Sequence, residues 1–245
     1  MRDVLRAARS NLVSHWRLKI ALSAVLTVFF CVPYFTLQRV PIFPVRRLAP
    51  GAIDDAIGFV PEWVWVYQSV YLLLSAVPWL CDSAHELRRY ARGFMVQSAI
   101  GFAFFLFLPI EAPRPDVVPD EVMFRLLVSY DKLLNSFPSL HVGLSVYTVL
   151  FAARISRGRL PAPLRSGMLL GLSLWAGAIA FSALATKQHY AIDLPAGAVL
   201  AWLCHRRVSE RTVRLTPDSP VRPDPCLTPD PCNLTPRSIR KESAC

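Results

Sequence analysis

Two short stretches of this chain combine residue types that can carry out nucleophilic and acid–base chemistry. Residues 137–141 read Phe-Pro-Ser-Leu-His, and residues 186–193 read Thr-Lys-Gln-His-Tyr-Ala-Ile-Asp. Each stretch places a histidine at the start of an apolar run of helical length. Ionisable side chains are costly within a lipid bilayer, so those that occur there usually serve a function.

His189 and Asp193 are four residues apart, which on a helix places them on one face, one turn from each other. A carboxylate in this position accepts a proton from one imidazole nitrogen and orients the other as a nucleophile or a base. The alternative is a buried polar pair that joins helices. Asn or Ser would serve that purpose without a charge, so we favour the functional interpretation.

The second histidine, His141, follows a sequence typical of a helix start. Pro138 suits the first helical turn, and the free N–H groups of that turn attract anions. The hydroxyl of Ser139 adds another donor. Pro-Ser near a helix start is common, so this motif gains its weight from the pairing with His189 and Asp193.

Arg114 and Lys187 supply positive charge near the same two motifs. The planar guanidinium of arginine matches the oxygens of a phosphate group. Either side chain could instead extend along the membrane interface toward lipid phosphates. For Lys187, two residues before His189, we favour the site, and for Arg114 the two interpretations are closely balanced.

Together these groups predict a phosphate site that works by phosphoryl transfer through a histidine. One imidazole attacks phosphorus, while the other protonates the leaving alkoxide and then activates the acceptor. Fixed donors must hold the charge on the equatorial oxygens.

Composition indicates the elements that must position these residues. The chain has 245 residues, of which 53% are apolar and 18% charged, values typical of a small multi-span membrane protein. A spanning helix needs about 20 residues. We therefore predict an all-α bundle of six transmembrane helices, with spans at residues 20–37, 63–80, 94–110, 137–153, 167–186 and 189–204.

The charge distribution predicts the orientation of this bundle. Most of the 27 lysine and arginine residues lie before the first run, after the second and fourth runs, and in the C-terminal tail. Positive residues accumulate on the cytoplasmic side of a membrane, so both termini are expected there. On this topology Arg114, His141 and His189 all lie at the extracytoplasmic face.

The chain is expected to have three regions. Residues 1–19 form a cytoplasmic N-terminal segment, residues 20–204 form the six-helix membrane domain, and residues 205–245 form a basic, proline-rich tail whose composition predicts disorder. The loop at residues 41–62 includes a short amphipathic stretch near residues 52–59. That stretch is expected either to lie on the membrane surface or to cover the site.

The two motifs resemble signature motifs of a known family. Pro-Ser-Leu-His at residues 138–141 and His-Tyr-Ala-Ile-Asp at residues 189–193 are similar to the second and third motifs of the type 2 phosphatidic acid phosphatase superfamily. The six-helix layout and the outward-facing site fit the same family. The resemblance covers about residues 20–204.

The resemblance implies a role for each matching residue. His189 would be the nucleophile that carries a phosphohistidine, and Asp193 would orient it. His141 would be the general acid and then the general base. Ser139 and Arg114 would hold the phosphate. No metal and no cofactor would be required.

The sequence departs from the family pattern at two places. The first motif pairs Arg-Pro with a lysine seven residues earlier; Arg114 is followed by proline, but the earlier position is Phe107. The third motif usually begins Ser-Arg, and here Ser182 is followed by Ala183, so Lys187 is expected to replace the missing charge. This form of the third motif looks more like the branch of inositol phosphorylceramide synthase-type phosphotransferases.

These observations predict an integral membrane lipid phosphatase of the inner (plasma) membrane. Its expected partners are a phospholipid or polyprenyl phosphate substrate and the membrane, with no nucleic acid. A phosphotransferase that moves a phospho-head group to a lipid alcohol is the first alternative. A non-catalytic lipid-phosphate binding or transport protein is the second, and a metal site built from His141, His189 and Asp193 is the third.

Overall fold

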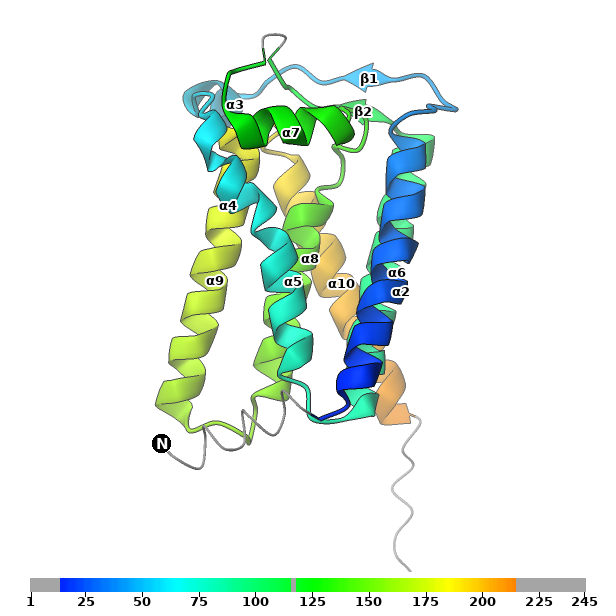
Figure 1. The fold of residues 1–245 in the computed structure, drawn as a ribbon, viewed down its shortest axis with the longest axis vertical. Helices are drawn as coiled ribbons and strands as arrows, with labels where there is room; N and C mark the ends of the chain where they lie inside the picture. Colours follow the sequence, from blue (N-terminus) through cyan, green and yellow to red (C-terminus); the bar gives the residue numbers. More distant parts are fainter. Residues whose placement is uncertain (1–13, 116–117, 215–245) are drawn as a thin grey trace, which may run out of the picture.

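The structure, a computed structural model, describes residues 14–115 and 118–214 and is mostly helical (Figure 1). Its elements in chain order are α2 (Trp16–Leu37), β1 (Arg46–Arg47), α3 (Ala52–Ala56), η1 (Pro61–Trp63), α4 (Val64–Gln68), α5 (Val70–Trp79), α6 (Ala84–Phe107), β2 (Ile110–Glu111), α7 (Val122–Tyr130), α8 (Leu140–Ile155), α9 (Ala162–Ala185) and α10 (Asp193–Arg214).

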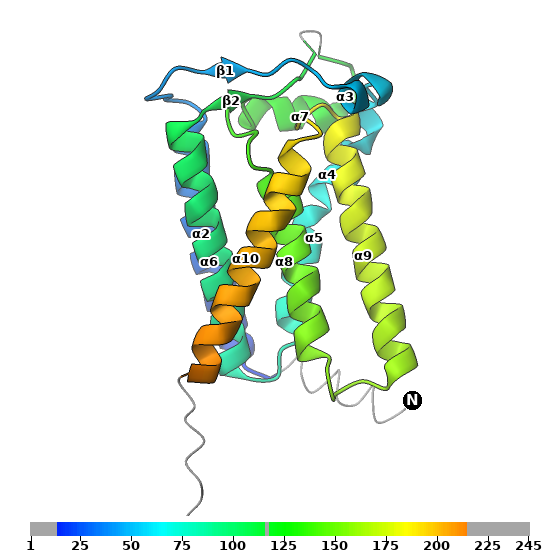
Figure 2. The ribbon, with the colours of Figure 1, turned by 180° about the vertical axis from the view of Figure 1, so that it is seen from behind.

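The long helices run side by side along the length of the molecule, and the short elements lie across one end. Figure 1 shows α3, α7 and the β1–β2 pair above the bundle, and Figure 2 shows the same arrangement from behind. We call this end, formed by α3, α7, β1 and β2, the capped end. The chain enters α8 and α10 from the capped end, so both motifs identified in the sequence lie there.

Three helices among the described residues are long and apolar enough to cross a membrane, namely α2, α6 and α9. The other three expected runs also coincide with helical segments but do not meet both conditions. Helix α8 has 16 residues, the second run is divided into α4 and α5 at Ser69, and α10 continues into a charged segment. Six crossings therefore stay a prediction.

The helix ends differ from those expected. Helix α2 starts at Trp16, four residues earlier than predicted, and α6 starts ten residues earlier than predicted, at Ala84. Helix α10 starts at Asp193 and not at His189, and it continues to Arg214. Residues 205–214 thus belong to a helix and not to the expected tail, whose remaining part, residues 215–245, lies outside the described residues.

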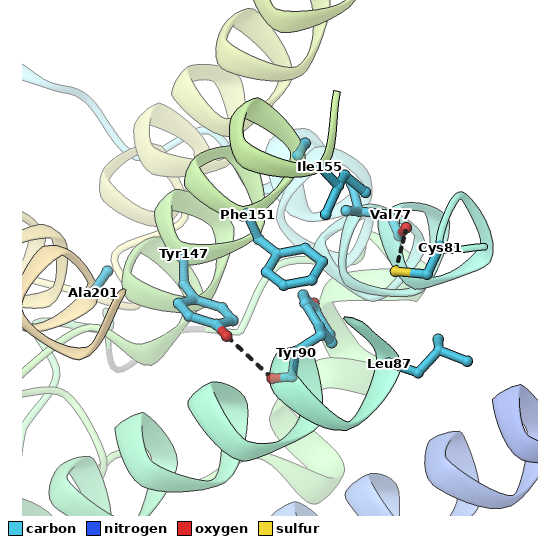
Figure 3. Close-up of a cluster of buried hydrophobic side chains, with 9 residues drawn as sticks. Val77, Cys81, Leu87, Tyr90, Tyr147, Phe151, Ile155 and Ala201 are labelled. Atoms are coloured by element: carbon cyan, nitrogen blue, oxygen red, sulfur yellow. Dashed lines mark hydrogen bonds between the residues drawn. The ribbon is translucent and has the colours of Figure 1, made fainter. Parts of the chain in front are cut away.

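A cluster of buried side chains joins α5, α6, α8 and α10 (Figure 3). At its centre the hydroxyl of Tyr147 donates to the backbone oxygen of Tyr90 at 3.2 Å. The Tyr90 hydroxyl in turn donates to the Leu74 carbonyl at 3.0 Å and contacts the Thr148 hydroxyl at 2.9 Å. Because buried polar groups need partners, these bonds fix how α8 sits between its neighbours.

Helices α8 and α10 approach each other so closely that their backbones touch. A Cβ atom added at Gly197 on α10 would lie 2.2 Å from the carbonyl oxygen of Ser139, and one added at Gly143 on α8 would lie 2.9 Å from the carbonyl oxygen of Gly197. Small residues allow such contact between helices. The contact places the start of α8 directly against the first turns of α10.

The elements α3, α7, β1 and β2 form a cap over this end of the bundle. Polar contacts hold the cap together, and it includes one helix, α7, that the sequence did not reveal. Strands β1 and β2 pair in parallel, and Arg47 binds Glu111 through two bonds of 2.6 and 2.7 Å. Helix α7, which was not predicted, packs Phe124 and Leu127 against Tyr67 of α4. The cap thereby covers the end of the bundle that carries the two motifs.

Candidate active site

The structure brings the two motif histidines together at the capped end. The ring centroids of His141 and His189 are 5.9 Å apart, and the ring planes are inclined by 59°. His141 lies in the first turn of α8, whereas His189 lies in the connection between α9 and α10. Two imidazoles at this separation can contact the same tetrahedral phosphate group.

The expectation that His189 and Asp193 lie on one helix is wrong, because α10 begins only at Asp193. The chain turns after α9 through Lys187, whose φ angle is +55°. This left-handed residue redirects the backbone. His189 therefore projects from a turn, and its orientation depends on tertiary contacts and not on helix geometry.

The nearest partner of the His189 ring is a backbone carbonyl. Its Nδ1 lies 2.9 Å from the carbonyl oxygen of Ser136 and 3.4 Å from Oδ2 of Asp193. A carbonyl oxygen only accepts, so Nδ1 carries the hydrogen in this contact. Nε2 then keeps its lone pair, which is the form that a nucleophilic imidazole requires.

Asp193 holds the surroundings of His189 in place. Its fully buried carboxylate accepts the backbone N–H of Tyr190 at 2.8 Å and the hydroxyl of Ser136. The first bond closes the turn that carries His189, and the second fixes the residue whose carbonyl meets the imidazole. Asp193 thus orients His189 chiefly through Ser136 and the turn.

His141 stacks on an aromatic ring that the sequence gave no reason to single out. Tyr67 of α4 lies with its ring centroid 4.1 Å from that of His141, and its hydroxyl is 3.1 Å from Nδ1. A tyrosine oxygen can accept a hydrogen bond from an imidazole N–H. If Nδ1 keeps its hydrogen and donates to Tyr67 in both states, Nε2 is the nitrogen that exchanges a proton.

Ser139 is the N-cap of α8, one residue before the helix starts. Its side-chain oxygen accepts the backbone N–H of Val142 at 3.3 Å, and its own N–H donates to the Asp193 carbonyl at 3.1 Å. An N-cap serine stabilises the first turn of a helix. The structure therefore gives Ser139 a clear role in joining α8 to α10, beside its predicted contact with phosphate.

Arg114 lies in the segment after β2 and reaches toward the turn that carries His189. Its Nη1 donates to the Asp131 carbonyl at 2.9 Å, its Nη2 donates to the side-chain oxygen of Gln188, and its buried Nε has no partner among the described residues. A guanidinium held at two nitrogens with a third still free suits an incoming anion.

The environment of Arg114 includes one buried acid. Asp131 follows α7 and accepts the hydroxyl of Tyr34 at 2.9 Å. Burial raises the pKa of its carboxyl group, and the positive charge of Arg114 opposes that rise. The charges of Asp131 and Arg114 therefore interact in this part of the structure.

The amine of Lys187 points away from this arrangement. Nζ donates to the backbone oxygens of Asp54 and Ile57, each at 2.6 Å. Two of its three N–H donors are thus used on α3 and the residue that follows it. The geometry indicates that Lys187 ties the turn to the cap, and it gives no support to the predicted phosphate contact.

Helix α3 also binds the turn that carries His189 through the side chain of Asp54. Asp54 accepts the backbone N–H of Ala191 at 2.7 Å and that of Gly51 at 2.8 Å, and only 8% of its surface is exposed. Of the two expectations for residues 52–59, the structure supports the second: this stretch contacts and covers the turn that carries His189.

Two hollows lie near the motifs and differ in character: one reaches His141, and the other reaches Arg114 and Tyr190. An apolar groove of about 220 Å³ lies between α2, α5, α6 and α8, and His141 forms part of its wall. A larger, more polar vestibule of about 880 Å³ lies under the β1–β2 pair, and its wall includes Arg47, Arg114 and Lys132. An apolar hollow thus lies beside His141 and a polar one beside Arg114.

Several residues of the site could not be found from local sequence. Tyr67 belongs to an apolar run, Asp54 to a loop, and Ser136 and Gln188 to the neighbourhoods of the motifs. The closeness of Ser136 to the first motif and of Gln188 to the second was the one available signal. Within residues 14–115 and 118–214, no group of three or more His, Cys, Asp or Glu side chains is arranged to hold a metal ion, so the metal-site alternative gains no support.

A comparison with protein-family models identifies a family. The model described as the PAP2 superfamily matches residues 54–206, more than half of the chain, and this span includes both histidines, Asp193 and Arg114. Neither the curated proteins nor the solved structures give a match.

Proposed function

Because the chain belongs to the PAP2 superfamily, we propose that it is a membrane lipid phosphatase that hydrolyses a phosphate or diphosphate lipid through a phosphohistidine. Members of this superfamily are generally phosphatases, which indicates a phosphatase-like, lipid-related function. The observation that carries the proposal is the 5.9 Å separation of the His141 and His189 rings, which come from two different segments of the chain.

In the first step Nε2 of His189 attacks phosphorus, and the bond from phosphorus to the lipid oxygen breaks. The Ser136 carbonyl at 2.9 Å keeps the hydrogen on Nδ1, so the lone pair of Nε2 is available. His141 gives its proton to the departing alkoxide, which leaves as the lipid alcohol or, from a diphosphate, as the lipid monophosphate. Nδ1 of His141 keeps its contact with Tyr67 throughout.

In the second step the now neutral His141 removes a proton from water. The oxygen of that water attacks phosphorus, the bond to Nε2 of His189 breaks, and inorganic phosphate leaves. His141 is protonated again at the end, so protons and bonds balance over the cycle. Acid–base assistance of this kind contributes roughly 10²–10⁴ in rate.

Arg114 is proposed to hold the charge that develops on the phosphate oxygens. Its two contacts with the Asp131 carbonyl and Gln188 fix the guanidinium beside the turn that carries His189, and its buried Nε is free to donate. Donors that are fixed before the reaction cost no rearrangement when charge develops. Ser139 supports the same site from the start of α8.

We further propose that the helical segments cross the membrane six times, with both termini in the cytoplasm and the capped end at the extracytoplasmic face. Residues 88–92 and 154–165, which are rich in arginine, lie at the end opposite the cap. An excess of positive charge is typical of the cytoplasmic side. The apolar surfaces of α2, α6 and α9 suit the lipid interior.

The polar vestibule favours a second candidate, a phosphotransferase of the inositolphosphotransferase type. The acceptor in hydrolysis is water, which needs little space, whereas a cavity of about 880 Å³ beside Arg114 has room for the polar head group of a larger acceptor. The chemistry is unchanged up to the phosphohistidine, and an alcohol then replaces water in the second step. Mass spectrometry of the products with and without an added lipid alcohol distinguishes the two.

The direct test is phosphate release from a panel of phosphatidate, alkyl phosphate and polyprenyl diphosphate lipids by purified protein. His189→Ala should reduce turnover by about 10⁴-fold or more, because the nucleophile is lost. The matched control is His85→Ala, which removes an exposed histidine at the other end of the bundle. Undiminished turnover by His189→Ala would end the proposal, and lipid binding without turnover would favour a binding or transport protein.

A further inference from the structure

The apolar groove beside His141 is built from one face of each helix around it. The contributing residues of α2 recur at helical spacing along three turns: Lys19, Leu22, Ser23, Leu26, Thr27, Phe30 and Cys31. The opposite wall comes from α5, α6 and the start of α8. A continuous stripe of this kind forms a channel along the helix axis and not an isolated pit.

The groove is open toward the side of the bundle. Helix α2 packs against α6 through Phe30, whose ring is 6.0 Å from that of Phe94 and 5.5 Å from that of Phe102. On the α5 side, Tyr71 of the groove wall is 51% exposed. An opening with apolar walls faces hydrocarbon and not water when the bundle lies in a membrane.

The two ends of the groove are chemically distinct. His141 lies at the end beneath the cap, and Lys19 lies at the other. The Lys19 side chain is buried, and its Nζ donates to the Trp79 carbonyl at 3.0 Å and lies 5.6 Å from the Trp79 ring centroid. A polar, tethered group at this position closes the far end of the channel.

We propose that this groove holds one hydrocarbon chain of the substrate lipid, with the phosphate between His141 and His189 and the chain running down α2 toward Lys19. The proposal rests on the proposed function and names the substrate class for the same site. Twelve residues separate Lys19 from Cys31, which at 1.5 Å per residue is about 18 Å. One leaflet of a bilayer core is roughly 15 Å thick, so the groove fits a chain of acyl length.

The groove aligns the chain and does not hold it by hydrophobic attraction. Lipid tails outside the protein are as apolar as the groove wall, so burial gains little free energy. What the wall provides is direction, because a chain lying along α2 sets the lipid oxygen next to the histidines. Near-attack geometry of this kind is a large part of catalysis.

Photo-crosslinking tests the groove without depending on turnover. The full-length His189→Ala protein in detergent is incubated with hexadecyl phosphate that carries a diazirine at the chain end, and adducts are located by mass spectrometry. Adducts should concentrate on Lys19, Leu22 and Pro78 near the closed end. Adducts spread over the exposed residues Val25, Val28 and Leu72 would overturn the proposal, because they would indicate ordinary surrounding lipid.

A steric block gives an independent readout. Ser23→Trp fills the groove, whereas Val25→Trp places the same side chain on the exposed face of α2. Ser23→Trp should lower the ratio of kcat/KM for hexadecyl phosphate to that for butyl phosphate by about tenfold or more, and Val25→Trp should leave this ratio unchanged. Equal ratios in both variants would overturn the groove.

The outcomes of these experiments distinguish a failure of the groove proposal from a failure of the proposed function. If neither phosphate ester is hydrolysed by the wild-type protein, the proposed function fails, and the crosslinking pattern still decides whether a chain occupies the groove. If hydrolysis depends on His189 but adducts and ratios do not follow the groove, the chemistry stands and the groove proposal falls.

Discussion

Two helix pairs in this bundle differ in how closely they pack: α8 and α10 are in backbone contact, whereas α2 and α5 are separated by a groove. Between α8 and α10 the backbones meet, with no room for a single Cβ atom at Gly197. Between α2 and α5 an apolar groove of about 220 Å³ remains. The close α8–α10 contact includes the start of α8 and the first turns of α10. Of the residues in the proposed chemistry, only His141 borders the groove, at one end of it.

This difference matches the different demands on the two regions. A displacement of 1 Å in a reacting group can cost about 10² in rate, so residues that transfer a proton or a phosphoryl group need a rigid support. A lipid chain needs only a path. Changes on the tight side should therefore affect the chemistry with every substrate, and changes on the open side should affect only long-chain substrates.

Among the substitutions that test this difference, His141→Ala is expected to have the largest effect. It removes the proposed proton donor and should lower kcat/KM for alkyl phosphates by roughly 10²–10⁴. A p-nitrophenyl ester leaves without needing a proton, so its kcat/KM should fall far less. Comparable losses with both leaving groups, measured side by side, would rule out His141 as the general acid.

The next largest effect is expected from a substitution in the close contact between α8 and α10. Gly197→Ala would place a methyl group 2.2 Å from the Ser139 carbonyl oxygen and should destabilise the protein by about 1–3 kcal/mol, because the helices must move apart. Activity should fall with it for short and long substrates alike.

Gly171→Ala is the matched control for this substitution. Gly171 lies on α9 with open space around it. Its replacement by alanine should stabilise the helix by roughly 0.5–1 kcal/mol. Thermal unfolding in detergent measures both variants. Equal shifts in Tm would show that the α8–α10 contact is not as close as described.

A smaller effect is expected where the cap holds the turn of His189. Asp54→Ala leaves the backbone N–H of Ala191 without its acceptor, at a cost of about 1–3 kcal/mol. If the turn loosens, kcat should fall about tenfold with little change in KM, and Asp54→Asn, which keeps an acceptor, should recover part of the loss. A change confined to KM would place Asp54 in substrate binding instead.

The positions of the helices and of both motifs could be predicted because their signals are local. Apolar runs of the right length marked α2, α4–α5, α6, α8, α9 and α10, although α8 begins at Leu140 and not at residue 137. The ends were less well predicted because a hydropathy pattern does not report capping: Ser83 accepts the N–H of Glu86 and starts α6 well before its apolar part.

The relation of His189 to its partners could not be predicted because it depends on tertiary structure. The spacing of four residues suggested a helix, but the left-handed Lys187 and the contacts of Asp193 produce a turn. Tyr67 comes from a separate helix and meets His141 only in the folded bundle. Contacts between distant segments leave no periodic signal in one sequence.

The central claim is that two imidazoles act on one phosphorus atom, with His189 as the nucleophile. The most direct test is to react the full-length protein with radiolabelled p-nitrophenyl phosphate, quench rapidly without acid and analyse the protein by mass spectrometry. We predict an acid-labile phosphoryl group on His189 that builds up in His141→Ala, because this leaving group needs no proton from His141 whereas the water-activating base is missing. Phosphate on another residue, or turnover with no phosphorylated protein in either form, would contradict the claim.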